Sequence, residues 1–380
     1  MQLLVVAGEA SGDQHAAAVL RAVSAAVPDL KCFGMGGEQL RAAGQEQLFG
    51  AEEISVMGIS EVLPKLPRIL KIFGALTAAA EKRRPDAALL VDVPDFNLRL
   101  ARRLRRLGIP VIYFISPMLW AWRSGRVRAI ARDVSKMLCI LPFEEAFYRE
   151  HGVSARYVGN PLLDHLPQPG PAASFRSKLG LDPHRPTVAL LPGSRASEIA
   201  RILPVLAESA AKLQALRPTL QCVVPLAPLV SDEEVRQVFR AHRVEPILVR
   251  GQAADAVGAS DAAVVASGTA ALEAGLMQRP LVVVYRVSPM TYWVGRAMLR
   301  VSHVSLVNLL AERAVVPELL QDDMTPERIV DEIQRVWDAG PARDAQLAGM
   351  REVRERLGEP GATARAAAEV LEVLRASPRA

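Results

Sequence analysis

Acidic side chains follow two apolar runs in the first half of the chain, where a carboxylate is well placed to act as a base. Asp92 follows the run 87–91, and Glu9 follows the run 3–6. Runs without a polar face are typical of parallel strands buried on both faces, and open α/β sheets bind ligands outside the carboxyl ends of such strands. We therefore predict that Asp92 is a general base acting on a hydroxyl and that Glu9 faces the same crevice.

Several polar neighbours of these two carboxylates have a structural alternative. Asp95 and Asn97 follow Pro94 in the same loop, and either one is suited to capping the helix that comes next. In the turn after Glu9, helix capping by Ser11 or Asp13 would explain both of those residues. We therefore favour Asp92 for chemistry and Asp95 for structure.

A basic residue follows an apolar run in the second half. The run 188–191 leads into Pro192-Gly193-Ser194-Arg195, where a helical pattern begins. A cation in the first turn of a helix opposes the helix dipole, so Arg195 destabilises the helix unless an anion offsets it. A phosphate bound by Arg195 and nearby backbone amides would provide that anion.

Hydroxyl groups and a glycine follow another strand in the same half. Ser267, Gly268 and Thr269 come directly after the run 262–266, and Glu273 lies one helical turn further on. Backbone amides and hydroxyls suit a diphosphate, and a carboxylate suits the two hydroxyls of a ribose. The alternative is that Glu273 only complements the helix dipole.

Two of the four tryptophans, Trp120 and Trp122, lie in the loop 116–123 after a predicted strand. Exposed tryptophan is unfavourable unless the ring stacks on something. The loop therefore either contacts a ligand or forms a small separate core. A Gly-x-Ser-x-Gly turn, a Walker A lysine and a Gly-x-Gly-x-x-Gly spacing are all absent from the sequence, which argues against those hydrolase and nucleotide-binding classes.

Apolar runs and helical patterns alternate along both halves, which predicts an α/β protein with two Rossmann-like, doubly wound parallel-sheet domains facing a central cleft. The Pro-rich segment 166–171 is the expected linker. The predicted domains are residues 1–165 and 166–350. A C-terminal helix, 351–380, follows them and either packs back on the first domain or does not. The predicted strands are residues 3–6, 31–33, 87–91, 111–115, 136–140, 187–191, 221–224, 247–249, 262–266 and 281–285.

The composition narrows the class of protein. The chain has 380 residues, half of them hydrophobic, which suffices for two cores. The three cysteines are isolated, so we expect a reducing compartment and no structural metal. The first apolar run lacks a preceding basic region and reads as a strand rather than a signal peptide. No stretch reaches the roughly 18 apolar residues of a membrane span.

Basic residues suggest a contact with anions. The net charge is +5, and five arginines fall between residues 99 and 106. They form either the solvated face of a helix or a surface that attracts anionic lipid. Nucleic acid is not expected as a partner, because no aromatic residues interleave with these arginines.

The segment 56–73 is basic and amphipathic and contains Pro64 and Pro67, which we expect to break it. It is either an ordinary core-facing helix or an apolar surface that contacts a membrane or an acyl chain. The apolar residues of the predicted surface are Met57, Ile59, Val62, Leu66, Ile69 and Phe73.

Nine segments, in chain order, together resemble the lipid-A-disaccharide synthase family of inverting glycosyltransferases with the GT-B fold. The matching segments are 7–13, 56–58, 92–97, 116–123, 141–144, 158–161, 191–195 with Glu198, 266–273 and 305–310. They extend from the first strand to the final helices, so the resemblance covers most of the chain. One position departs from the family pattern, because residue 160 is Asn where the family usually has His. Asparagine cannot take a proton near neutral pH, so no acid–base role is expected there.

The resemblance implies a UDP-2,3-diacylglucosamine donor, a 2,3-diacylglucosamine 1-phosphate acceptor and a β-1,6-linked disaccharide 1-phosphate product of lipid A biosynthesis. Asp92 would be the base, in an acceptor- and lipid-side first domain, and the second domain would bind the UDP-sugar. The implied donor-binding residues are Arg195, Ser267, Gly268, Thr269, Glu273 and Asn308, and the implied acceptor-side or cleft residues are Glu9, Ser11, Trp120 and Asn160.

The same resemblance implies no metal and no cofactor, and a cytoplasmic protein held peripherally at the anionic inner membrane. A homodimer is left open. The competing interpretations are a related UDP-sugar enzyme, such as a UDP-N-acetylglucosamine epimerase or a transferase with a non-lipid acceptor, and a non-catalytic binding module.

Overall fold

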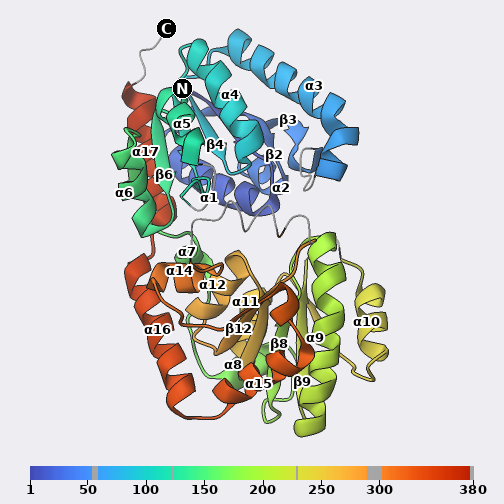
Figure 1. Ribbon diagram of the computed structural model, residues 1–380. Helices are drawn as coiled ribbons and strands as arrows, with labels where there is room; N and C mark the ends of the chain where they lie inside the picture. The colour runs from blue at the N-terminus through green and yellow to red at the C-terminus, as the bar shows by residue number, and fades with distance from the viewer. Residues whose placement is uncertain (54–58, 121–123, 228–229, 289–291, 293–301, 377–380) are drawn as a thin grey trace. The chain divides into compact units, whose positions relative to one another are not determined.

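The chain forms two compact units, each described here by itself (Figure 1). The computed structural model describes residues 1–380 except 54–58, 121–123, 228–229, 289–291, 293–301 and 377–380. The first unit consists of Met1–Asp164 and Glu359–Ala380, and the second of His165–Gly358. The chain returns to the first unit beyond the expected boundary at residue 350, because helix α16 (Pro341–Leu357) spans that position without a break.

The first unit contains a seven-stranded parallel sheet in the order β3-β2-β1-β4-β5-β6-β7. Its strands are β1 (Gln2–Ala7), β2 (Lys31–Gly36), β3 (Glu46–Gly50), β4 (Ala87–Val91), β5 (Val111–Phe114), β6 (Lys136–Cys139) and β7 (Ala155–Tyr157). The order reverses between β1 and β4, as in a doubly wound sheet.

Helices cover both faces of this sheet, which explains why its inner strands are apolar except at their first residues. Successive side chains alternate between faces, and Leu3, Leu4, Val5 and Val6 are all fully buried. Leu3 and Val5 join the core with α1 (Ala10–Ala26), α2 (Glu38–Ala42) and α17 (Ala362–Ala376). Leu4 and Val6 join the core with α3 (Ile59–Arg83), α4 (Pro94–Arg106), α5 (Val127–Asp133) and α6 (Pro142–Glu150). The short α7 (Leu162–His165) spans the boundary between the units.

The second unit contains a six-stranded parallel sheet in the order β10-β9-β8-β11-β12-β13. Its strands are β8 (Thr187–Leu191), β9 (Gln221–Leu226), β10 (Ile247–Arg250), β11 (Ala262–Ala266), β12 (Leu281–Tyr285) and β13 (Glu318–Leu320). One face packs against α9 (Ala196–Leu216), α10 (Asp232–Arg240) and α15 (Pro326–Trp337). The remaining helices are α8 (Ala172–Lys178), α11 (Ala253–Ala259), α12 (Thr269–Leu276), α14 (Leu306–Ala311) and α16.

The predicted fold class of two doubly wound parallel-sheet domains is confirmed, and every predicted strand is present. The strands that the sequence did not predict are β3, β7 and β13. Each lies at the edge of its sheet and is short, so none forms a long apolar run. Edge strands of this kind lack the signal that identifies the inner ones.

Helix α3 runs through Pro64 and Pro67 without ending, so the predicted break there is wrong. No helix in the described part of the chain is both long enough and apolar enough to cross a membrane. Helix α3 instead packs along the sheet, with Ile72 and Leu76 fully buried in the core.

The apolar residues predicted to form a lipid surface on α3 divide into two groups. Ile69 and Phe73 are partly buried and pack against the core. Leu66 is exposed, at 38% of its accessible surface, and so is Leu70, at 57%, which was not among the predicted residues. Met57 lies outside the described residues, as do the side chains of Ile59 and Val62. The core-facing interpretation therefore holds for Ile69 and Phe73, and the exposed surface is Leu66 and Leu70.

Candidate active site

Four of the predicted site residues, Glu9, Asp92, Arg195 and Ser267, follow strands at which the strand order of their sheet reverses. In the first unit, Glu9 follows β1 and Asp92 follows β4, and these two strands are neighbours. In the second unit, Arg195 lies in the turn after β8 and Ser267 follows β11, again on neighbouring strands. The carboxyl ends of strands at such a reversal are the usual ligand-binding position of an open α/β sheet.

Asp92 lies in a turn whose backbone is strained. Asp92 has φ 55° and Val93 has φ 43°, although neither is glycine. A β-branched residue rarely adopts this left-handed conformation, and each such residue costs about 1–3 kcal/mol. The Asp92 amide still donates to Phe114 O, at 3.2 Å, so the pairing of β4 with β5 continues to this residue. The backbone of the half-buried Asp92 is therefore fixed at the carboxyl end of the central strand β4.

The polar residues after Asp92 do not cap α4. The N-cap residue is Val93, and no side chain accepts a hydrogen bond there. Asp95 is exposed and pairs with Arg126 Nη1 at 2.7 Å. Asn97 is fully buried and directs its amide nitrogen back to the Val91 and Asp92 carbonyls. The capping prediction for Asp95 and Asn97 is thus wrong.

The turn after β1 differs from the prediction in a similar way. Glu9 is half-exposed at the N-cap of α1, and neither Ser11 nor Asp13 caps that helix. Ser11 is exposed. Asp13 is buried and accepts hydrogen bonds from the amides of Gly37, at 2.7 Å, and Gln39, at 2.9 Å. Asp13 therefore stabilises the start of α2, a partner that local sequence patterns do not indicate.

Trp120 is anchored inside the first unit. Its Nε1 donates to Glu144 Oε1 at 3.1 Å, and its ring meets Phe143 edge-on with centroids 4.8 Å apart. Glu144 is almost fully buried and also accepts from the amides of Ile140, at 3.2 Å, and Leu141, at 3.0 Å. Burial raises the pKa of Glu144 to about 7. These contacts fit the interpretation that Trp120 belongs to a small core, and Glu144 is a buried acid that the sequence did not single out. Trp122 lies outside the described residues.

Asn160 is also used internally. Its Nδ2 donates to Ile140 O at 3.2 Å, and its Oδ1 accepts from the Leu162 amide at 3.0 Å. The side chain is buried and links the loop after β7 to the loop after β6. These contacts hold the two loops together and need no proton transfer.

Arg195 has an anionic partner within the chain. It is the N-cap residue of α9, and its Nη1 lies 2.9 Å from Glu198 Oε1. Glu198 Oε2 also accepts from the amides of Ser194 and Arg195, both at 3.4 Å. Glu198 thus offsets the cation, so Arg195 at this position does not by itself require a bound phosphate. The Arg195 side chain remains 44% exposed, and among its contacts with described residues only Nη1 is engaged.

The turn after β11 leaves its polar groups accessible. Ser267 Oγ makes one long hydrogen bond, 3.4 Å to Val304 O, and Thr269 is exposed. Gly268 has φ 148° with open space beside its Cα, so a ligand can approach the backbone closely. The Glu273 side chain is half-buried and makes no hydrogen bond or ion pair with any residue in the described part of the chain. Burial raises its pKa, and a carboxyl group in this situation suits hydroxyl donors of a ligand.

Asn308 is fully engaged within the second unit. Its Nδ2 donates to Val316 O at 2.9 Å and to Glu318 Oε1 at 2.8 Å. Its Oδ1 accepts from the amides of Val315, at 2.8 Å, and Val316, at 2.9 Å. The structure therefore places Asn308 as a link between α14 and the segment leading into β13.

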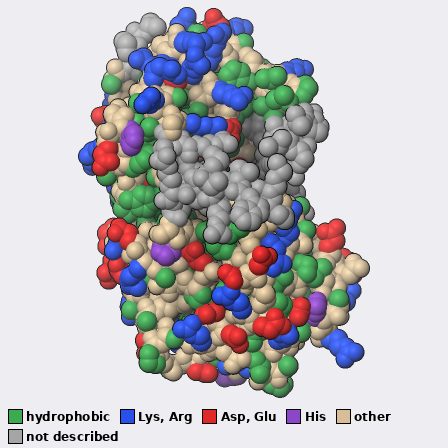
Figure 2. Space-filling model, viewed as in Figure 1, with side chains coloured by type: hydrophobic (Ala, Val, Ile, Leu, Met, Phe, Trp, Pro, Cys, Tyr) green, Lys and Arg blue, Asp and Glu red, His purple; other side chains and the backbone are tan. Residues whose placement is uncertain are grey.

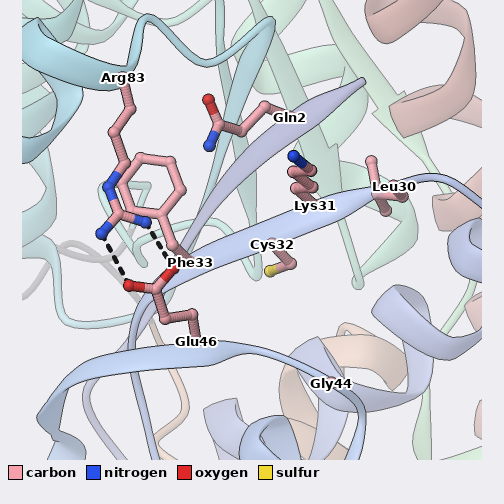
Figure 3. A pocket seen from close by; sticks show the side chains of 8 residues that line it. All are labelled: Gln2, Leu30, Lys31, Cys32, Phe33, Gly44, Glu46 and Arg83. Atoms are coloured by element: carbon pink, nitrogen blue, oxygen red, sulfur yellow. Dashed lines mark hydrogen bonds and ion pairs between the residues drawn. The ribbon is translucent and has the colours of Figure 1, made fainter.

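A hollow of about 560 Å³ lies at the opposite end of the first sheet (Figure 3). It surrounds the amino-terminal residues of β1, β2 and β3, and Arg83 of α3 pairs there with both oxygens of Glu46, at 2.6 and 2.7 Å. Because it lies at the amino ends of the strands, this hollow is separate from Asp92 and Glu9.

The two sheet edges offer different chemistry. The first presents the carboxylates of Glu9 and Asp92, and hydrogen bonds fix the backbone of Asp92. The second presents an exposed guanidinium, hydroxyls, an open glycine turn and the Glu273 carboxyl group. The described residues contain no group of three or more His, Cys, Asp or Glu side chains arranged to hold a metal ion.

Comparison with known proteins identifies a family. A family model described as lipid-A-disaccharide synthetase matches residues 3–369. A protein of Myxococcus xanthus (strain DK1622) named lipid-A-disaccharide synthase is 63% identical over 373 residues, covering 98% of this chain and 97% of its own. One of the same name from Anaeromyxobacter dehalogenans (strain 2CP-1 / ATCC BAA-258) is 55% identical over 375 residues, covering 98% of each chain.

Solved structures share the fold at much lower identity. The S. aureus MnaA–UDP structure aligns with a TM-score of 0.67 and 12% identity, covering 99% of this chain and 98% of that one. The calicheamicin glycosyltransferase CalG4 aligns with a TM-score of 0.60 and 15% identity, covering 100% and 99%. At these identities the similarity shows the GT-B fold alone.

Proposed function

The chain belongs to the lipid-A-disaccharide synthase family, and we propose that it transfers diacylglucosamine from UDP-2,3-diacylglucosamine to 2,3-diacylglucosamine 1-phosphate. The product is the β-1,6-linked disaccharide 1-phosphate, and UDP is released. The chain is thus a glycosyltransferase of lipid A biosynthesis. The observation that carries the individual roles is the position of Asp92, Arg195 and Glu273 at the strand-order reversals of the two sheets.

The first unit provides the base and the acceptor side. Asp92 takes the proton from the 6-hydroxyl of the acceptor as that oxygen attacks the anomeric carbon of the donor. The bond from that carbon to UDP breaks on the opposite side, so the configuration inverts. A positioned general base accelerates such a step by about 10²–10⁴-fold. Glu9 and Ser11, in the turn after the neighbouring β1, contact the acceptor sugar.

The second unit binds the nucleotide. The exposed guanidinium of Arg195 and the amides at the start of α9 face the diphosphate, and the hydroxyls of Ser267 and Thr269 add donors. The carboxyl group of Glu273, which has no partner among the described residues, accepts hydrogen bonds from the ribose hydroxyls. Because arginine and helix ends offset the charge on the departing UDP, the reaction is expected to need no metal ion. Asn308 contributes by fixing α14 rather than by touching the donor.

Both substrates carry acyl chains, so we propose peripheral contact with the anionic cytoplasmic face of the inner membrane. Leu66 and Leu70 are exposed one turn apart on α3, and Lys71 beside them is exposed. Lys and Arg side chains also gather at the top of Figure 2, over the first unit. The exposed arginines of α4 are Arg99, Arg102, Arg103, Arg105 and Arg106. Apolar contact plus basic charge suits an anionic lipid surface.

Vesicle flotation tests this surface. Replacing Leu66 and Leu70 by Ser should reduce binding to vesicles containing phosphatidylglycerol by about fivefold, because apolar area is lost. Leu216→Ser removes an equally exposed leucine, 54% accessible, from the second unit and should change nothing. Equal vesicle binding by the unmodified chain, the Leu66/Leu70 double variant and Leu216→Ser would contradict the proposed surface.

The function itself is tested with purified protein and both lipid substrates, with and without EDTA. Disaccharide 1-phosphate and UDP should form at equal rates in both samples. Absence of disaccharide in both would exclude the proposal, and loss only with EDTA would exclude metal independence. A parallel incubation with UDP-N-acetylglucosamine should yield no epimer, which separates the transferase from the epimerase alternative. Light scattering on the same preparation decides whether the chain forms the homodimer that the sequence left open.

A further inference from the structure

We propose that Asn97 and Tyr113 are positioning residues for Asp92: their hydrogen bonds to backbone carbonyls hold the left-handed turn that aims the carboxylate. The inference rests on the proposed role of Asp92 as the base. Asn97 lies in the first turns of α4, and Tyr113 lies on β5, the strand beside β4. Neither residue is expected to touch a substrate, because both side chains are fully buried.

Asn97 binds three consecutive carbonyl groups. Its side-chain Nδ2 donates to Val91 O at 3.1 Å and to Asp92 O at 2.8 Å. Its backbone amide donates to Val93 O at 3.0 Å. One residue therefore fixes the end of β4 and both strained residues of the turn.

Tyr113 fixes the same turn from the neighbouring strand. Its hydroxyl donates to Asp92 O at 2.5 Å, so that carbonyl receives two hydrogen bonds from two different elements. Burial raises the pKa of Tyr113 well above its usual range, so the hydroxyl keeps the proton that it donates. A strained turn persists only where its surroundings over-determine it, and these contacts do so.

The turn changes the direction of the Asp92 side chain. In a regular strand, side chains alternate between faces, so Asp92 would point away from the face that Val91 occupies. A Cβ atom built at Gly12 would instead lie 3.7 Å from Val91 Cγ1 and 3.9 Å from Asp92 Cβ. The left-handed turn thus brings both side chains towards the β1–α1 turn, where Glu9 lies.

The side-chain oxygen of Asn97 indicates that the amide is needed as a hydrogen-bond donor. Asn97 Oδ1 is buried and has no hydrogen-bond partner among the described residues. An unsatisfied buried oxygen is unfavourable, so packing alone does not account for an amide here. Gln45 provides a matched case in the same unit. It is also buried, its Nε2 donates to Val5 O at 2.9 Å, and its Oε1 has no partner within the described part of the chain.

The first test compares steady-state rates of Asn97→Ala, Tyr113→Phe and Gln45→Ala. Loss of positioning by about 1 Å costs about 100-fold, so we expect kcat to fall about 100-fold in Asn97→Ala and about 10-fold in Tyr113→Phe. The KM for the UDP donor should stay within about twofold, because the second unit binds it. Gln45→Ala should lower the melting temperature as much as Asn97→Ala but keep kcat within about twofold. Equal kcat losses in Asn97→Ala and Gln45→Ala, or unchanged kcat in both Asn97→Ala and Tyr113→Phe, would overturn the inference.

A double-mutant cycle then tests whether Asn97 acts through Asp92. In an Asp92→Asn background, Asn97→Ala should cause no further loss of kcat, because the group that it positions is gone. A further 100-fold loss would assign Asn97 a role of its own and overturn the inference.

A crystal structure of Asn97→Ala separates this inference from the proposed function, because it requires no activity. We expect residues 92 and 93 to leave the left-handed region. A turn that kept both positive φ values would overturn the positioning role. Inactive wild-type protein with a relaxed turn in the variant would instead overturn the proposed reaction and leave the geometry standing.

Discussion

In both sheets, turns at the carboxyl ends of the strands contain residues with positive φ, but the residue types differ between the two units. We call these two sets of strand ends the first edge and the second edge. In the first unit, the turns after β4 and β5 place Asp92, Val93 and Ile115 at φ values of 55°, 43° and 65°. In the second unit, the turns after β8 and β11 place Gly193 and Gly268 at φ values of 105° and 148°. Glycine adopts these conformations without strain, whereas the other three residues need surrounding contacts to hold them. At the first edge, contacts with neighbouring residues therefore hold the backbone in place. At the second edge, glycine leaves the backbone accessible to a ligand.

The polar side chains follow the same division. Around the first edge, Asn97, Glu144 and Asn160 are buried and bonded to neighbouring loops. On the second, Thr269 is exposed and Glu273 is unpaired among the described residues. A base must be held within a fraction of an ångström, whereas a nucleotide site needs free donors and acceptors before its ligand arrives. This difference supports the proposed assignment of base and nucleotide to separate units.

The largest expected effect is that of Asp92→Asn. We expect kcat to fall about 1000-fold, since a general base is lost, while the Kd for UDP stays within about twofold. Rates are measured by disaccharide formation and UDP binding by calorimetry. Asp95→Asn is the control, because this neighbouring carboxylate is exposed and paired with Arg126; it should keep kcat within about twofold. Weakened UDP binding in Asp92→Asn would contradict the proposal that the base and the nucleotide site belong to separate units.

The rigidity of the first edge can be tested through Glu144. Burial raises its pKa from 4.5 to about 7, so between these pH values the folded chain holds a proton that the unfolded chain has released. The contribution of Glu144 to stability is therefore greatest below about pH 4.5 and is lost as the pH rises to about 7, on the order of 3 kcal/mol in all. Glu144→Gln should remove this decline from the pH dependence of the denaturation midpoint. A variant with the wild-type pH dependence would show that Glu144 titrates normally.

The openness of the second edge can be tested through Arg195. Arg195→Gln should weaken UDP binding by about 10- to 100-fold, because a charge-assisted hydrogen bond to phosphate is worth about 1.5–3 kcal/mol. Arg201→Gln serves as the control, since Arg201 is a cation on the same helix that donates to Ser197 O. Calorimetric titration with UDP should show the loss only for Arg195→Gln. Equal affinities would mean that Arg195 serves only its ion pair with Glu198.

The smallest expected effect concerns the ribose. Glu273→Gln should weaken UDP binding only about three- to tenfold, because an amide oxygen still accepts one hydroxyl. Binding of 2′-deoxy-UDP, measured in the same titration, should change less than binding of UDP, because one of the two hydroxyl contacts is already missing. Equal losses for both nucleotides would assign Glu273 to helix stability rather than to the ribose.

The sequence predicted the inner strands and their end residues, because both depend on patterns within a few residues. Apolar runs identified every inner strand, and Asp92 and Arg195 were recognisable as polar residues at strand ends. The sequence did not predict the partners. Asp13 was expected to cap its own helix and instead binds the amides at the start of α2, and Arg195 is offset by Glu198 rather than by a ligand alone. Each such choice depends on distances that local patterns do not specify.

Hydrophobic periodicity alone thus determined that the chain forms two doubly wound parallel sheets, since a strand covered on both faces must be apolar at every position. Only the tertiary structure decided how Asp92 is held, because its turn depends on Asn97 from the next helix and Tyr113 from the next strand. The strand order brings Tyr113 beside Asp92 across a separation of 21 residues, whereas Asn97 lies five residues away on the helix that follows. A strained backbone conformation is stable only when the surrounding structure supplies contacts that fix it.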